Sequence, residues 1–102
     1  MIHVVAKVTT KPGKRPDFLT EFRKLVPLVL AEAGCVEYGP TIDAQTEIGA
    51  QRLAGDDVVV VIERWENLAA LKAHLVADHM TAYRERVKVL VEGTILEVYE
   101  SV

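Results

Sequence analysis

Residues alternate along 2–9, IHVVAKVT, which predicts a β-strand. One face would carry Ile2, Val4, Ala6 and Val8, and the other face would carry His3, Val5, Lys7 and Thr9. After the KPG sequence at 11–13, apolar residues recur at the period of a helix. These residues are Phe18, Phe22, Leu25 and Val29. We therefore predict a helix from about residue 15 to residue 33 that stops at Gly34, with a kink near Pro27.

Three strands and two helices are predicted after Gly34. Strand 35–43 leads into segment 44–56, whose polar residues and glycines predict a loop or a ragged hairpin. Strand 57–65, DVVVVIERW, precedes an N-cap at Asn67. The helix after this cap would bury Leu68, Leu71 and Leu75. A last helix, capped by Asp78 and ended by Gly93, would bury Met80, Tyr83, Val87 and Leu90. The final strand is 94–102.

The order β-α-β-β-α-α-β predicts an α+β protein with one domain over residues 1–102. A ferredoxin-like layer of four antiparallel strands with the helices on one face fits this order. The outer face of such a sheet should be polar, but the run Val58–Ile62 is apolar on both sides. A monomer would leave this second apolar face exposed. We therefore expect a homodimer that packs sheet against sheet.

Composition and charge narrow the function classes. The chain has 12 basic and 15 acidic residues in a mixed distribution, so we expect no nucleic-acid partner. The longest apolar stretch is far too short for a membrane span, and the start lacks a signal-peptide pattern, so we expect a cytoplasmic protein without a membrane partner. The single cysteine, Cys35, is more typical of a small core residue than of a nucleophile.

The segment ERWENLAALKAHLVADHM, residues 63–80, holds the candidate chemistry. Either Glu63 or Arg64 must point toward the helices, because consecutive strand residues face opposite sides. The alternative interpretation makes both residues solvated charges at the edge and Trp65 a core or interface aromatic residue.

Two histidines follow these residues. His74 lies at the margin of the buried helical stripe, where it could face a cavity or be an ordinary core histidine. His79 stands four residues before Tyr83, so the two could form a hydrogen bond on one helical face.

Resident cofactors are not expected. The two histidines are five residues apart across a predicted helix break, and no third ligand stands at a metal-motif spacing. The sequence also contains no glycine-rich phosphate loop, no G-x-S-x-G elbow and no dinucleotide fingerprint. Any catalysis would therefore use side chains alone.

Four segments together resemble a known family: VVAKVTTKPGK, VPLVLAEAGCVEYGPTID, VVVVIERWENLAALKAHL and DHMTAYRERVK. The most specific part is E-x-W followed by A-L-x-x-H-L and H-M-x-x-Y. Over nearly its whole length the chain resembles the antibiotic biosynthesis monooxygenase family, in particular its bacterial quinol monooxygenases. The resemblance implies a dimeric α+β barrel with a pocket between sheet and helices in each subunit. It also implies oxidation of a hydroquinone or phenolic aromatic substrate by O2 without metal, flavin or haem.

The resemblance transfers pocket positions to Tyr38, Glu63, Trp65, His74, His79 and Tyr83. Our hypothesis is that His74 removes the phenolic proton, because histidine titrates near neutral pH. Tyr38 or Tyr83 would bind the substrate oxygen, with His79 as a further candidate catalytic residue. Trp65 and Met80 would form an apolar wall, and Glu63 would orient a histidine or be structural.

Other activities of the same fold remain as alternatives. Haem-degrading relatives need an asparagine and a tryptophan that the matching positions lack, and Tyr83 or Arg84 replaces the haem histidine. An isomerase of a phosphorylated metabolite would need clustered basic residues, for which only Arg64, Lys7 and Arg86 are candidates. A quinone-binding module without catalysis is the third alternative.

Overall fold

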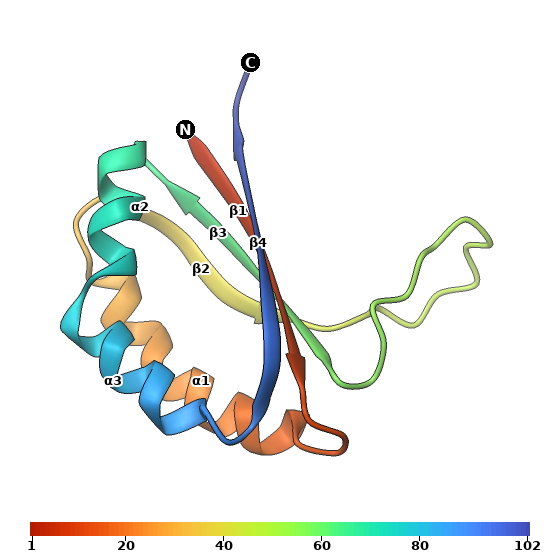
Figure 1. Ribbon diagram of the computed structural model, residues 1–102. Helices are drawn as coiled ribbons and strands as arrows, with labels where there is room; N and C mark the ends of the chain where they lie inside the picture. Colours follow the sequence, from red (N-terminus) through yellow and green to blue (C-terminus); the bar gives the residue numbers. More distant parts are fainter.

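Four strands form one antiparallel sheet, and three helices lie on one of its faces (Figure 1). The computed structural model describes residues 1–102. Its elements are β1 (Ile2–Thr10), α1 (Arg15–Leu30), β2 (Cys35–Thr41), β3 (Val58–Trp65), α2 (Leu68–Leu75), α3 (Asp78–Val87) and β4 (Val91–Glu100). The strand order is β2-β3-β1-β4. The predicted ferredoxin-like α+β fold and its element order are confirmed.

The core lies between the sheet and the three helices. The predicted apolar stripes of β1 and α1 are buried in full. On β3 the buried face consists of Val59, Val61, Glu63 and Trp65. In register, Val4 lies opposite Glu63 and Ala6 opposite Val61, so the two strands present one continuous face to the helices. Each aliphatic side chain buried here contributes roughly 1.5–3 kcal/mol to folding.

The helix α1 ends three residues earlier than predicted. It runs through Pro27 to Leu30, after which the Glu32 N–H binds the Val29 carbonyl and the chain tightens into a turn. Gly34 still has the left-handed conformation expected of a stop signal, with φ of +84°. Because the helix has ended, Glu32 belongs to the turn between α1 and β2 rather than to a helical face.

The predicted ends of α3 are wrong. The residue at its N-cap is Ala77, and Asp78 is the first helical residue and makes no capping hydrogen bond. The helix ends at Val87, and Gly93 lies inside β4, opposite Thr9. The final strand therefore begins at Val91 and not at Thr94. None of the three helices is long and apolar enough to cross a membrane.

Residues 42–57 form a long excursion that projects away from the helices (Figure 1). Its two limbs are tied together as a ragged hairpin without strand pairing. The Asp43 carboxylate accepts hydrogen bonds from the N–H groups of Ala54 and Gly55, both at 2.9 Å. The Gln51 amide donates to the Ala44 carbonyl at 2.8 Å.

The turn at Gly34 is predicted to be intolerant of any side chain. A Cβ at this position would lie 2.6 Å from Cβ of Ala70 on α2, in addition to the strain of a positive φ. Gly13 also has a positive φ, but a Cβ there would meet nothing within 4 Å. We expect Gly13→Ala to lower the free energy of unfolding by about 1–2 kcal/mol through strain alone. Gly34→Ala should lower it by about 1–3 kcal/mol more. Urea unfolding of both variants measures the difference, and equal losses would contradict the predicted contact with α2.

Candidate functional site

A cavity of about 460 Å³ lies between the sheet and the α2 and α3 helices. Most of its lining is apolar, and Phe22, Val61 and Met80 are among the residues that form the wall. The polar residues on the wall are Tyr38, Glu63, His74, Tyr83, Arg84, Lys88 and Thr94. Such a cavity, apolar with a few convergent polar groups, is typical of a site for a small organic molecule.

His74 is more deeply buried than predicted, since the sequence placed it at the margin of the buried stripe of its helix. Only 1% of the residue is exposed, and its ring packs against the rings of Trp65 and Tyr38, with centroid distances of 4.7 and 5.4 Å. Burial lowers the pKa of His74, whereas the negative charge of Glu32 opposes this effect. Charges on His79 and Arg84 lower the pKa further. The imidazole is therefore favoured in its neutral form at neutral pH.

Glu32 joins the two histidines, and its role was not predicted from the sequence. Its Oε2 atom lies 2.8 Å from Nδ1 of His74 and 2.7 Å from Nε2 of His79. Glu32 is 42 and 47 residues from these partners in the chain. No spacing rule could link the three positions, and the prediction that residue 32 lies in a helix concealed the turn that aims its side chain inward.

Glu32, His74 and His79 also offer the ligand types of a transition-metal site, and their ligand atoms lie within 4.8 Å of one another. Spacing in the sequence suggested no third ligand, whereas the structure provides a carboxylate. However, both nitrogens converge on the same carboxylate oxygen at hydrogen-bond length. Around one tetrahedral ion, ligand atoms about 2.0–2.2 Å from the metal would lie about 3.3–3.6 Å from one another. The geometry is that of a hydrogen-bonded triad.

Glu63 points toward the helices and Arg64 points away from them. Arg64 pairs with Glu37 on the outer face at 3.1 Å, as a solvated charge would. Glu63 is only 4% exposed, and its Oε1 atom accepts a hydrogen bond of 2.9 Å from Nε1 of Trp65. Burial raises the pKa of Glu63 to about 7, an effect that the bond from Trp65 opposes. Glu63 makes no hydrogen bond to a histidine. The carboxylate that binds His74 belongs to Glu32, in the role that the sequence suggested for Glu63.

The two tyrosines of the wall keep their hydroxyl protons. Burial, together with the charge of Glu63, raises the pKa of Tyr38, and burial raises the pKa of Tyr83. Both hydroxyls are therefore available as hydrogen-bond donors within the cavity.

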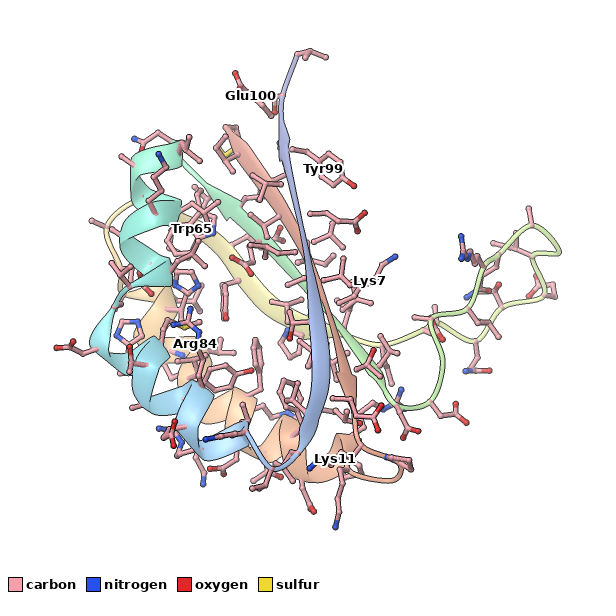
Figure 2. The ribbon with its side chains drawn as sticks, viewed as in Figure 1. Lys7, Lys11, Trp65, Arg84, Tyr99 and Glu100 are labelled. Carbon is pink, nitrogen blue, oxygen red and sulfur yellow. The ribbon has the colours of Figure 1, made fainter.

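Two of the predicted site residues lie behind the cavity wall. Trp65 is fully buried between α2 and the sheet, where it contacts His74 and Glu63 rather than the cavity (Figure 2). His79 does not line the cavity and binds Glu32 instead of Tyr83. Tyr38, Glu63, His74, Met80 and Tyr83 do line it.

Comparison with known proteins identifies the class. Residues 1–86 match the family described as antibiotic biosynthesis monooxygenase. The chain belongs to this family. It is 43% identical over 100 residues to the protein named probable quinol monooxygenase YgiN of Escherichia coli K12, covering 96% of this chain and 91% of YgiN.

Solved structures agree with the fold. PA3566 from Pseudomonas aeruginosa superposes with a TM-score of 0.80 at 24% identity, covering 99% of this chain and 93% of that one. Rv0793 from Mycobacterium tuberculosis gives a TM-score of 0.80 at 22% identity, with coverages of 99% and 94%. At these identities the likeness concerns the fold alone.

Glu63 should make the protein less stable as the pH rises. Its folded pKa of about 7 lies above the usual value of 4.5, so the folded state retains a proton that the unfolded chain loses. The contribution is most favourable below pH 4.5 and is lost as the pH rises to about 7. We expect the free energy of unfolding to fall between pH 5 and pH 7.5 by roughly 2–3 kcal/mol more in the natural protein than in Glu63→Gln. Urea unfolding at the two pH values tests this, and parallel curves would exclude a buried acid at this position.

Proposed function

We propose that the protein is a cofactor-independent monooxygenase that oxidises a hydroquinone or related phenol with O2. Its membership of the family and its likeness to YgiN support monooxygenase chemistry. The substrate class rests on the cavity, whose apolar wall suits an aromatic ring and whose polar groups suit phenolic oxygens.

One observation carries the proposal: a buried histidine presents a free nitrogen to an apolar cavity. Nδ1 of His74 is bound to Glu32, whereas Nε2 makes no hydrogen bond within the protein. Every fully buried polar side-chain atom of the protein has a hydrogen-bond partner. Because Nε2 has none, it is not fully buried, and the space it faces is the cavity that His74 lines. A base in this position can reach the hydroxyl of a bound phenol.

The proposed chemistry begins with transfer of the phenolic proton to Nε2 of His74. The resulting phenolate is electron-rich enough to reduce O2, which the neutral phenol reduces slowly. For a hydroquinone with an unsubstituted ring carbon, one oxygen atom enters that carbon and the other leaves as water. The product is a hydroxyquinone, and the substrate itself supplies all the electrons, so no external reductant is consumed.

The remaining polar groups would hold the substrate. The hydroxyls of Tyr38 and Tyr83 can donate to the phenolate oxygen formed at His74. Glu63 can bind the second hydroxyl through the oxygen that Trp65 leaves free. Met80 belongs to the apolar wall against the ring. Trp65 supports the site from behind by fixing Glu63 and packing on His74.

None of the three basic residues suggested for an isomerase lines the cavity. Arg64 and Lys7 lie on the outer face of the sheet, where they pair with Glu37 and Glu97, and Arg86 pairs with Glu21. Arg84 and Lys88 do line the cavity. These two cations are the feature that an anionic substrate would use, and a panel of substrates should therefore include phenols that bear a carboxylate.

We also propose that two copies pack through the outer face of the sheet. The residues on this face follow from the register and include Val5, Val60, Ile62 and Ile95 at its centre. Lys7 and Tyr99 project from the same side, away from the helices (Figure 2). No helix covers this apolar face in the single chain (Figure 1).

Oxygen uptake tests the proposed activity. Purified protein, free of metal and flavin, is mixed with reduced quinones such as menadiol, and uptake is corrected for autoxidation. We expect uptake and incorporation of one ¹⁸O atom into the ring, with His74→Ala reduced by about 100-fold or more. The control is Lys72→Ala, since Lys72 is exposed on the same helix as His74 and does not line the cavity. An unchanged rate in His74→Ala would remove His74 from the mechanism. Absence of uptake across the panel would favour an isomerase or a binding module.

The proposed dimer predicts the behaviour of two charge substitutions. Val60 and Ile95 both lie opposite Lys7 in the register, at the centre of the outer face. We expect the natural protein to elute at about twice its chain mass of 11.3 kDa and Val60→Lys/Ile95→Lys to elute as a monomer. Val76→Lys is the control, because Val76 is exposed beside the helices. Light scattering after size exclusion gives the masses, and a monomeric natural protein would contradict the dimer.

A further inference from the structure

The carboxylate of Glu32 links three separate elements of the fold at one point. Glu32 lies in the turn after α1, His74 near the end of α2 and His79 in the first turn of α3. The exposed fractions of their side chains are 13%, 2% and 27%, respectively. The triad therefore runs from the wall of the cavity, at His74, to the surface, at His79.

The chemistry of the shared atom determines where the protons are. An ionised carboxylate can only accept hydrogen bonds, so each nitrogen that binds Oε2 must carry a hydrogen. His74 therefore carries its hydrogen on Nδ1. A neutral imidazole has only one such hydrogen, so Nε2 of His74 holds a lone pair where it faces the cavity. A base requires this tautomer, since the other would present an N–H to the substrate.

We propose that Glu32 is the positioning residue that makes His74 a base, and that His79 holds Glu32 in place. Glu32 selects the tautomer of His74 and stabilises the imidazolium that forms when Nε2 takes the phenolic proton. His79 donates to the same oxygen from the solvent side, which prevents the carboxylate from rotating away. The catalytic part of this inference rests on the proposed oxygenase function, whereas the tautomer does not.

The charged and titratable groups around His74 determine the expected pH effect. Glu32 faces it from the turn after α1, His79 and Arg84 from α3, Tyr38 from β2 and Glu63 from β3. Only the interaction with Glu32 favours the protonated ring, whereas burial and the interactions with His79 and Arg84 disfavour it. Removal of the Glu32 charge should therefore make His74 a weaker base.

Nitrogen-15 NMR of the histidines tests the tautomer without any substrate. In the natural protein, treated with EDTA, we expect His74 to show a protonated Nδ1 and a bare Nε2 at neutral pH. In Glu32→Ala, which removes the acceptor, this preference should be lost. Glu32→Gln retains the shape and removes only the charge, so it keeps the test valid if the alanine variant does not fold. Glu85→Gln is the matched control, because the side chain of Glu85 on α3 is 78% exposed.

Kinetics then separate positioning from simple structural support. We expect Glu32→Gln to lower kcat by about 100-fold, with KM changed by less than about threefold, and to move the acidic limb of the pH profile to lower pH. His79→Gln should lose much less activity, because its amide can donate the same hydrogen bond, whereas His79→Ala should approach the Glu32→Gln value. Glu85→Gln should behave like the natural protein.

The outcomes distinguish this inference from the proposed function. A Glu32-dependent tautomer without oxygen uptake would support the positioning role and contradict the oxygenase. Uptake that depends on His74 but not on Glu32, with an unshifted pH profile, would overturn the positioning role. The histidine spectrum of the untreated protein is also compared with that of the EDTA-treated protein. If the two spectra differ and added Zn²⁺ restores the untreated spectrum, the triad is a metal site and the positioning role is overturned.

Discussion

Incomplete coverage of the sheet by the helices creates the cavity on which every other feature of the site depends. The helices bury the inner faces of β1 and β3, but β4 lies at the edge of the sheet, beyond their reach. The inward-facing residues Leu96 and Val98 of β4 remain 45% and 44% exposed. A four-stranded sheet with full helical cover would have a solid core. Here the uncovered edge leaves an apolar space into which a few polar side chains project.

The two carboxylates of the site have different partners. Glu63 is buried without a cationic partner, and its one side-chain donor, Trp65, only partly compensates for the lost hydration, so its pKa rises to about 7. Glu32 is less deeply buried, and its Oε2 atom accepts hydrogen bonds from two imidazoles. One cavity thus combines a carboxyl group that titrates near neutral pH, a supported neutral base and two protonated tyrosines.

Local patterns predicted the parts of the fold that depend on local physics. The helical spacing from Phe18 to Val29 identified the buried face of α1, because burial itself imposes this period, and the alternation in β1 placed Ile2, Val4, Ala6 and Val8 together on the face that is buried. Helix ends were less predictable. Asp78 has the side chain of a cap, but Ala77 occupies that position, and Gly93 pairs within β4 although glycine commonly ends helices. Tertiary packing overrides such preferences because they are worth only about 1 kcal/mol.

Most of the site residues to which the sequence pointed line the cavity, but the sequence did not point to Glu32. Residues 63–80 stand out because they lie close together in the chain, and five of the seven predicted site residues line the cavity. Glu32 has no motif, and its importance arises only from a turn that brings it to two distant histidines. Composition predicted a loop or a ragged hairpin over residues 44–56, but it does not encode the hydrogen bonds from Ala54 and Gly55 to Asp43 that tie the two limbs together.

Strand β4 links the proposed chemistry to the proposed assembly. Alternate residues of one strand face opposite sides, so Thr94 and Leu96 belong to the cavity while Ile95 and Tyr99 belong to the outer face. A partner that orders the outer face of β4 would also fix the backbone that carries the cavity wall. Because β4 is an edge strand that pairs only with β1 and that the helices leave largely uncovered, its position depends on such support. The geometry of the cavity and the contact between copies would therefore be coupled through this one strand.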